Sequence, residues 1–258
     1  MSNTQQILHQ ALSNWQGWQT HGAALYSQPQ VVCELLGGKT NRSFLVANGA
    51  FQAVVRVNAS NSSSLGIDRD RERKILQLLQ PTGYVPKLLF SSDKVLVTEF
   101  CDGRHWTQAD LSEVSNRHAV NAMLEQIQSI AVPDLPPRNY VDYCTAYINQ
   151  LDKSMVDPAL VEMILSAAGA IDKSTWPAVI CHHDLVAENI IVTADSLVLL
   201  DWEYAAMGHP ALDYLRLYQS DPESTNLSPI NRSYDTDSIE QLKVVQRGMD
   251  DLWTLVQD

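Results

Sequence analysis

Hydrophobic residues in the first hundred positions recur in short, β-branched runs that are typical of strands. The run over residues 30–36 is the first of these, and Gly37 and Gly38 end it. Turn residues such as Asn48 and Gly49 separate the later runs, which predicts a mostly β region. The further strands that we expect cover residues 43–46, 53–57, 86–90 and 94–100.

One helix interrupts this β region. Apolar residues recur at helical spacing over residues 68–80, and Asp68 suits the N-cap position. The sequence Pro81-Thr82-Gly83 then stops the helix.

From residue 101 onward the spacing of apolar positions changes to that of helices. An amphipathic helix is predicted over residues 111–130, and others over residues 159–170 and 238–257, with one more between the prolines at 133–137 and residue 159. Residues 220–237 are polar and predict a loop. Short strands return in this half, over residues 179–181, 190–193 and 197–200. The pattern predicts an α+β fold with a β-rich lobe over residues 1–99 and a mainly helical lobe over residues 100–258.

Composition narrows the classes of protein that this pattern allows. The chain has 258 residues, 45% of them hydrophobic, and a net charge of −12. No apolar run approaches the roughly 18 residues of a membrane span, and no secretory signal is visible, so we expect a cytoplasmic protein. The negative charge argues against binding to nucleic acid or to an anionic membrane. It suits either plain solubility or a cationic substrate.

The four cysteines carry no sign of a metal site or a disulfide framework. Cys33, Cys101, Cys144 and Cys181 lie far apart, with no C-x-x-C spacing. We therefore expect reduced thiols.

Oxygen-bearing side chains gather in the segment His182-His183-Asp184-Leu185-Val186-Ala187-Glu188-Asn189 and after the strand that ends at Leu200. Asp184 and Asn189 bracket a loop between two predicted strands, and Asp201 ends the next hairpin. Carboxylate and amide oxygens suit Mg²⁺ together with phosphate, and one carboxylate remains to address a hydroxyl. The spacing resembles that of the protein-kinase-like phosphotransferases.

Two further sequence segments narrow this resemblance to one superfamily. Over roughly residues 35–217 the chain resembles the aminoglycoside phosphotransferase and choline kinase superfamily, whose fold is bilobal and protein-kinase-like. The chain resembles the choline/ethanolamine and thiamine kinase-like branch in particular. This likeness is carried by two segments, Leu200-Asp201-Trp202-Glu203-Tyr204-Ala205 and Gly208-His209-Pro210-Ala211-Leu212-Asp213.

The resemblance implies a role for each matching residue of the catalytic loop. Asp184 would be the catalytic base or would position the acceptor hydroxyl, and Asn189 and Asp201 would hold Mg²⁺. His182 and Asp213 would brace the loop without touching the substrate.

The resemblance also implies an ATP site in the β-rich lobe. Gly37, Gly38, Thr40 and Asn41 match the phosphate loop of the family, although an ordinary tight turn has the same composition. The Walker A alternative fails, because position 33 is Cys and a strand follows the loop.

The strand over residues 53–57 takes the place of the kinase strand that supplies a phosphate-binding lysine. Arg56 stands there instead, which keeps the charge but changes its shape, and Glu72 would be its partner. The other charges of residues 68–73 are expected to form a solvated helix face. Glu99 and Cys101 would lie in the hinge that contacts adenine through its main chain.

The expected acceptor is a small alcohol, and the sequence Trp202-Glu203-Tyr204 favours a cationic one. Aromatic and acidic groups bind cations, although core packing explains the two aromatic residues equally well. Choline, ethanolamine and thiamine all fit. Two alternatives stay open, an aminoglycoside-type phosphotransferase and an inactive kinase fold that serves as a binding module. A protein kinase is disfavoured, because G-x-G-x-x-G and A-P-E motifs are absent. The sequence carries no signal of oligomeric state.

Overall fold

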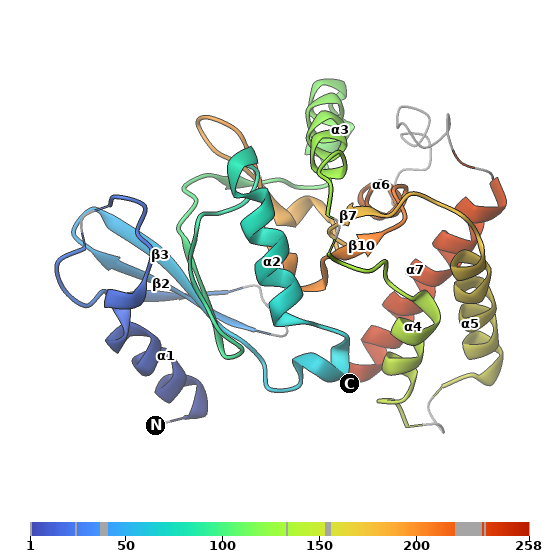
Figure 1. Cartoon of the computed structure of the whole chain (residues 1–258), viewed down its shortest axis with the longest axis horizontal. Coiled ribbons are helices and arrows are strands. Elements are labelled where there is room, and N and C mark those ends of the chain that lie inside the picture. Colours follow the sequence, from blue (N-terminus) through green and yellow to red (C-terminus); the bar gives the residue numbers. More distant parts are fainter. Residues whose placement is uncertain are drawn as a thin grey trace.

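The computed structural model of the chain describes residues 2–23, 25–36, 41–132, 134–152, 156–219, 234 and 236–257. A twisted sheet lies at one end of the molecule and most of the helices lie at the other, with helix α2 between them (Figure 1). Three residues of the expected phosphate loop, Gly37, Gly38 and Thr40, lie outside the described residues, as do residues 220–233 of the expected polar loop.

The N-terminal sheet has five antiparallel strands in the order β1-β2-β3-β5-β4. Gly49 adopts a φ of 60° in the turn between β2 and β3, a conformation that glycine tolerates without strain. Alternate residues of β3 point to opposite faces, so Val55 and Val57 are buried on one side while Arg56 faces the other. The strands are β1 (Gln30–Leu35), β2 (Arg42–Asn48), β3 (Phe51–Val57), β4 (Leu88–Ser91) and β5 (Val95–Glu99).

Helix α1 (Asn3–Ser13) packs against β3 and β5 and covers one face of the sheet (Figure 1). Its N-terminus has a capping box, in which Ser2 and Gln5 exchange hydrogen bonds between side chains and backbone. Leu8 and Leu12 join the buried side chains of the sheet in a small separate cluster. The sequence analysis did not predict this helix.

Helix α2 (Arg69–Leu79) begins after Asp68, whose side chain accepts a hydrogen bond from the backbone N–H of Arg71. Its apolar face buries Ile75 and Leu79 against the larger core of the molecule. That core includes residues from both sides of residue 99, so α2 joins the sheet to the helical region. The domain boundary between residues 99 and 100 stays a prediction.

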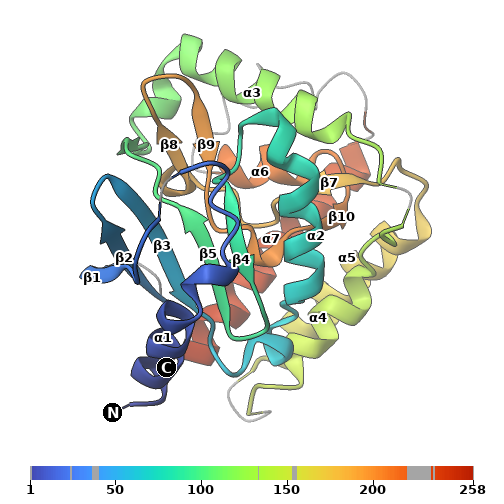
Figure 2. The same ribbon diagram turned by 60° about the vertical axis from the view of Figure 1, so that its left-hand side comes forward.

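The C-terminal region is mainly helical and carries two small sheets (Figure 2). The hairpin of β8 (Ile190–Val192) and β9 (Leu197–Leu199) pairs with β6 (Arg104–His105), and β7 (Val179–Cys181) pairs with β10 (Ala206–Gly208). The helices are α3 (Val114–Gln128), α4 (Tyr140–Ile148), α5 (Pro158–Lys173), α6 (Leu212–Leu217) and α7 (Thr236–Gln257). Short 3-10 helices lie at Trp15–Gly17, Ser62–Leu65, Gln80–Thr82, Asp110–Ser112, Ala187–Asn189 and Trp202–Tyr204.

This arrangement confirms the predicted α+β fold with a β-rich and a helical region. Periodicity located the long elements, and their ends differ from the prediction by a few residues. The elements that it missed after α1 are β6, β10 and α6, all six residues or shorter. Within the ranges that the structure describes, no helix combines the length and apolar character needed to cross a bilayer.

Close packing of α5 on α7 generates a prediction about Gly248. A Cβ at this position would clash with Cγ1 of Ile164, which is fully buried. Gly248→Ala is therefore expected to lower the free energy of unfolding by about 1–3 kcal/mol, because the tightly packed core must shift. Urea denaturation measures this change.

Gly169 on α5 is the matched control. A Cβ there would meet Val141 at an ordinary 3.8 Å, so Gly169→Ala should stabilise the protein by about 0.5–1 kcal/mol through helix propensity. Equal stabilisation by both substitutions would contradict the packing that the structure shows.

Candidate active site

A cavity of about 640 Å³ opens between the loop after β7, the segment after β9 and helices α4, α6 and α7. Its lining is rich in carboxylates and aromatic rings. Among the described residues, the one Lys or Arg side chain in this lining is Arg216. The carboxylates are Asp184, Glu188, Asp201, Glu203 and Asp250, and the aromatic rings include Tyr140, Tyr143, Tyr147, Tyr204 and Trp253.

The loop that follows β7 is held in place through its backbone. The Asp213 carboxylate accepts hydrogen bonds from the N–H groups of His182 and His183, at 2.7 and 2.9 Å. Nε2 of His182 lies 2.7 Å from the carbonyl oxygen of Leu200, which ties the loop to the end of β9. Burial raises the pKa of Asp213, while the charge of His182 and these hydrogen bonds lower it in part. His182 and Asp213 therefore hold the loop through hydrogen bonds, and neither lines the cavity. Their role as braces of a catalytic loop stays a prediction.

Asp184, Asn189 and Asp201 all line this one cavity. The Asn189 side-chain N–H donates to the Asp184 carbonyl oxygen at 3.0 Å, which fixes the amide orientation and leaves its oxygen for another partner. Asp201 adopts a left-handed conformation with a φ of 59°, which is uncommon for a residue other than glycine. Its pKa is raised by burial in the cleft and then by repulsion from Glu203, whereas Arg56 lowers it. The side chain keeps 41% exposure, so water screens part of this repulsion.

This donor set fits Mg²⁺. Within the described ranges, no three His, Cys, Asp or Glu side chains are grouped to hold a metal by themselves. Mg²⁺ does not need such a group, because it commonly takes one or two carboxylates and completes its shell with water and substrate phosphates. An Asn189 oxygen and the Asp201 carboxylate are ligands of that type, and the surplus negative charge near Asp201 favours a cation.

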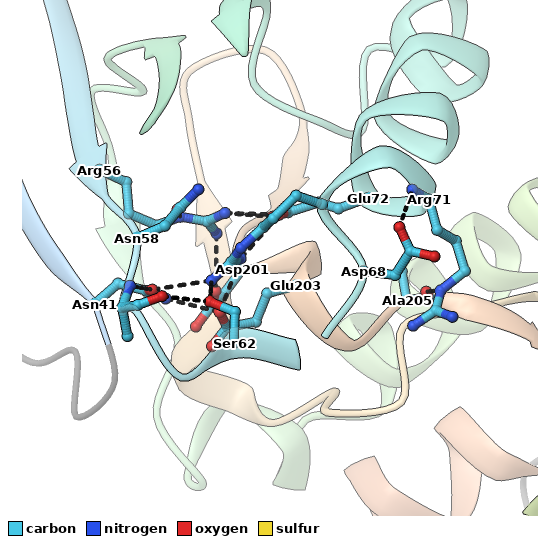
Figure 3. A network of polar contacts seen from close by, with 12 residues as sticks. Asn41, Arg56, Asn58, Ser62, Asp68, Arg71, Glu72, Asp201, Glu203 and Ala205 are labelled. Carbon is cyan, nitrogen blue, oxygen red and sulfur yellow. Dashed lines mark hydrogen bonds and ion pairs between the residues drawn. The ribbon is translucent and has the colours of Figure 1, made fainter. Parts of the chain in front are cut away.

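Arg56 belongs to a buried polar network that joins β3, α2 and the segment after β9 (Figure 3). Its guanidinium donates to both carboxylate oxygens of Glu72 at 2.7 Å, to Asn58 at 3.1 Å and to Asp201 at 3.4 Å. Burial raises the pKa of Glu72, but the charges of Arg56 and Arg69 outweigh it and hold that pKa below 4.5. Sequence analysis named this pair of Arg56 and Glu72, and the structure brings the two side chains together.

Arg69 extends the network to Glu203 and Asn41. It donates to the carboxylates of Glu72 at 3.0 Å and Glu203 at 3.1 Å, and to the Asn41 side-chain oxygen at 3.1 Å. Asn41 also donates to Glu203 at 2.7 Å, so the residue that ends the expected phosphate loop is tied to the segment after β9.

The expectation that the other charges of residues 68–73 form a solvated helix face is wrong in part. The Arg69 side chain is only 8% exposed, and Arg71 donates to the backbone carbonyl oxygens of Gly66 and Ala205. Arg69 stands three residues before Glu72 on the same side of α2, and this spacing was the available signal.

The three residues expected to contact substrate separate into two groups. Glu203 and Tyr204 line the cavity, and the hydroxyl of Tyr204 lies 3.1 Å from that of Tyr147. Trp202 is buried in the core, where its indole N–H donates to the carbonyl oxygen of Leu199. Its ring centroid lies 4.8 Å from that of His182, with the two rings tilted by 53°. Core packing therefore accounts for Trp202.

Helices α4 and α7 supply aromatic residues that sequence analysis missed. Tyr140, Tyr143 and Tyr147 recur at spacings of three and four on α4, so they share one helix face, and Trp253 faces them from α7. The tyrosine spacing was a usable signal, whereas nothing local distinguishes Trp253 from a core residue.

The expected hinge residues lie outside the lining of this cavity. Glu99 ends β5, where its backbone N–H donates to the carbonyl oxygen of Lys87 and its carboxylate pairs with the Lys87 ammonium at 3.0 Å. Cys101 is half-buried, and burial raises the pKa of its thiol to about 11. Their contact with adenine stays a prediction.

A family model described as choline/ethanolamine kinase matches residues 32–218. The "Protein LicA homolog" of Mycoplasma capricolum is 29% identical over 144 residues, which cover 54% of this chain and 57% of that protein. Ethanolamine kinase 2 of Mus musculus is 24% identical over 172 residues, which cover 62% and 44% of the two chains. The chain thus spans about half the length of the curated relatives that it matches.

A solved structure of LicA in complex with AMP shares the fold. Its TM-score is 0.80 at 20% identity, over 100% of this chain and 91% of that one. The likeness confirms the protein-kinase-like architecture expected from the resemblance. The family match ends at residue 218, so α7 and its contribution to the cavity lie beyond it.

The buried network generates a prediction about Glu72. Glu72→Gln should lower the free energy of unfolding by about 3–5 kcal/mol near neutral pH, because it leaves Arg56 and Arg69 without their shared carboxylate. Since the pKa of Glu72 is lowered on folding, its contribution is complete above pH 4.5 and is lost as the pH falls toward the folded-state value. Urea denaturation over this range should show the difference from wild type shrinking on acidification.

Asp70 is the control for this experiment, because it pairs with Arg73 on the exposed side of α2. Asp70→Asn should change stability little at any of these pH values. A Glu72→Gln difference that grows on acidification would contradict the assignment.

Proposed function

Since the chain belongs to the choline/ethanolamine kinase family, we propose that it transfers the γ-phosphoryl group of ATP to the hydroxyl of a small cationic alcohol. The observation that carries this proposal is the joint position of Asp184, Asn189 and Asp201 in a cavity that aromatic residues also line. Phosphoryl transfer depends on positioning and on neutralising charge, and these three side chains supply the groups for both.

The nucleotide end of the site would lie at the buried network. Arg56 is held by Glu72 and reaches Asp201, so its charge lies beside the residue that would bind metal. Asn189 and Asp201 would hold Mg²⁺, which supplies charge neutralisation on the phosphates when bound. Asn41, and the glycine loop before it, would complete the phosphate end.

Asp184 would orient the acceptor hydroxyl and accept its proton. The side chain is 35% exposed and points into the cavity, where an alcohol can reach it. A carboxylate can act in this way when the hydroxyl is held within hydrogen-bonding distance.

The part of the cavity that would hold the acceptor alcohol suits a cationic group. Tyr143, Tyr147, Tyr204 and Trp253 line the same cavity as the carboxylates. Rings of this kind bind a cation with about 0.5–2 kcal/mol each, and the acidic lining adds Coulomb attraction. An alcohol of the choline or ethanolamine type has the required size and charge. Thiamine is a second candidate, because it combines a cationic aromatic ring with a hydroxyl.

An ADP-release assay over choline, ethanolamine, thiamine and an aminoglycoside tests the proposal. We expect turnover on a small cationic alcohol and none on its neutral isostere, 3,3-dimethylbutanol in the case of choline. Turnover of the aminoglycoside alone would contradict the acceptor class. Absence of both turnover and ATP binding would instead favour the inactive binding module.

Asp184→Asn should reduce kcat by about 10²–10⁴-fold, because it removes the acceptor of the hydroxyl proton while keeping the shape of the side chain. Calorimetry should show ATP binding close to wild type. Asp201→Ala should weaken ATP binding in the presence of Mg²⁺ as well. Asp195→Asn, on the exposed turn between β8 and β9, is the control that should leave kcat unchanged. Wild-type kcat in Asp184→Asn would disprove the assignment.

Trp253→Leu should raise KM for a cationic acceptor by about 2- to 30-fold, which is the equivalent of one cation–π contact. KM for ATP should stay within about twofold, because the nucleotide would lie at the other end of the cavity. Steady-state kinetics with Trp15→Leu as the control measures both constants, since Trp15 packs beside the N-terminal sheet. A change confined to KM for ATP would show that Trp253 faces the nucleotide.

A further inference from the structure

We propose that Arg216 is a positioning residue that couples the Asp184 carboxylate to helix α7, an inference that rests on the proposed function. The Arg216 guanidinium donates through Nη2 to Oδ1 of Asp184 at 3.0 Å. Through Nη1 it donates to Oδ2 of Asp250 on α7. One side chain of α6 thereby links the group that would meet the acceptor hydroxyl to the helix that forms the far wall of the cavity.

The position of Arg216 on α6 supports a specific contact with Asp184. Asp213 and Arg216 lie three residues apart, so they project from the same face of this short helix. The Asp213 carboxylate accepts hydrogen bonds from the backbone N–H groups of His182 and His183, and Arg216 donates to the carboxylate of the next residue, Asp184. One face of α6 therefore holds both the backbone and the carboxylate of the loop.

Burial and charge also set this contact apart from an ordinary surface ion pair. The Arg216 side chain is 18% exposed, and its Nε–H is buried without a hydrogen-bond partner, which is a cost that the two ion pairs must offset. A guanidinium can serve two carboxylates through its two terminal nitrogens, whereas a lysine ammonium is a single point charge. With a carboxylate on either side, the arginine adds no net positive charge that would repel a cationic acceptor.

The contact has a consequence for geometry in the cavity. Oδ1 of Asp184 is committed to Arg216, which leaves Oδ2 for the acceptor hydroxyl. Trp253 follows Asp250 by three residues on the same face of α7. The surface that would hold the cationic group and the oxygen that would receive the proton are thus fixed relative to each other. A misplacement of about 1 Å between such groups can cost about 10²-fold in rate.

Other contacts hold α7 in place, so loss of the bridge should leave the protein folded. Gln246 donates to the carbonyl oxygen of Leu212 at 2.8 Å, and Gly248 packs on Ile164 of α5. Arg216→Met is therefore expected to reduce kcat for a cationic alcohol by about 10- to 100-fold, with KM for ATP within about twofold of wild type. Arg216→Lys should recover part of the loss, since it can reach one carboxylate but not both.

Arg117→Met is the matched control for lost stability. This buried arginine donates to the carbonyl oxygens of Leu111 and Ser112, away from the cavity. It should lower the denaturation midpoint while leaving kcat unchanged. If Arg216→Met behaved in the same way, or kept wild-type kcat, its role would be structural and the proposal would be wrong.

A double-mutant cycle with Asp250→Asn tests the coupling to α7 directly. If Asp250 acts through Arg216, the double variant should have about the kcat of Arg216→Met alone. Independent effects that multiply, with a separate rise in KM for the acceptor, would show instead that Asp250 binds the substrate cation itself. That result would overturn the coupling and leave the proposed function intact.

The same cycle measured by urea denaturation needs no activity. We expect the losses of stability in the two single variants to be non-additive, and additive losses would show that the bridge does not exist. A wild-type protein that turns over none of the alcohols would contradict the proposed function, and the denaturation cycle would then decide on the bridge alone.

Discussion

Four charged side chains lie buried between the sheet and the cavity, and each is held there by an opposite charge. Arg56 and Arg69 share the Glu72 carboxylate, and Arg69 reaches Glu203 as well. A buried charge that loses its partner costs several kcal/mol, so these contacts fix α2, β3 and the segment after β9 relative to one another. Asp201 lies in that segment, two residues before Glu203, and its place beside Arg56 depends on the same constraint.

The same cavity combines two kinds of side chain. Asn189 and Asp201 line it beside the buried network, and they would hold Mg²⁺ and phosphate under the proposed function. Aromatic residues of α4 and α7 line it as well, and they would bind a cationic group. The loop that carries Asp184 is held through its backbone by Asp213 and through the Asp184 carboxylate by Arg216. The short helix α6 therefore supplies both of these contacts.

Local sequence patterns predicted the parts of the molecule that depend on residues close together in the chain. Periodicity located the long helices and strands, and the spacing of Asp184, Asn189 and Asp201 predicted three side chains that the fold does bring to one cavity. Contacts made by tertiary packing had no such signal. The sequence around Arg69 predicts a surface charge, because its burial depends on contact with Glu203, which is distant in sequence. Asp250 and Trp253 lie on a helix beyond the family match. Trp202 is the opposite case, because sequence analysis named it as a candidate substrate-binding residue and the structure buries it in the core.

Phosphorus-31 NMR of a reaction mixture tests most directly the central claim, that this cavity transfers phosphate to an alcohol. The mixture would contain the protein, ATP, Mg²⁺ and a small cationic alcohol. The account predicts a new phosphomonoester signal that grows in equal amount with ADP. Growth of inorganic phosphate with ADP, and no ester, would show that water is the acceptor and would contradict the account.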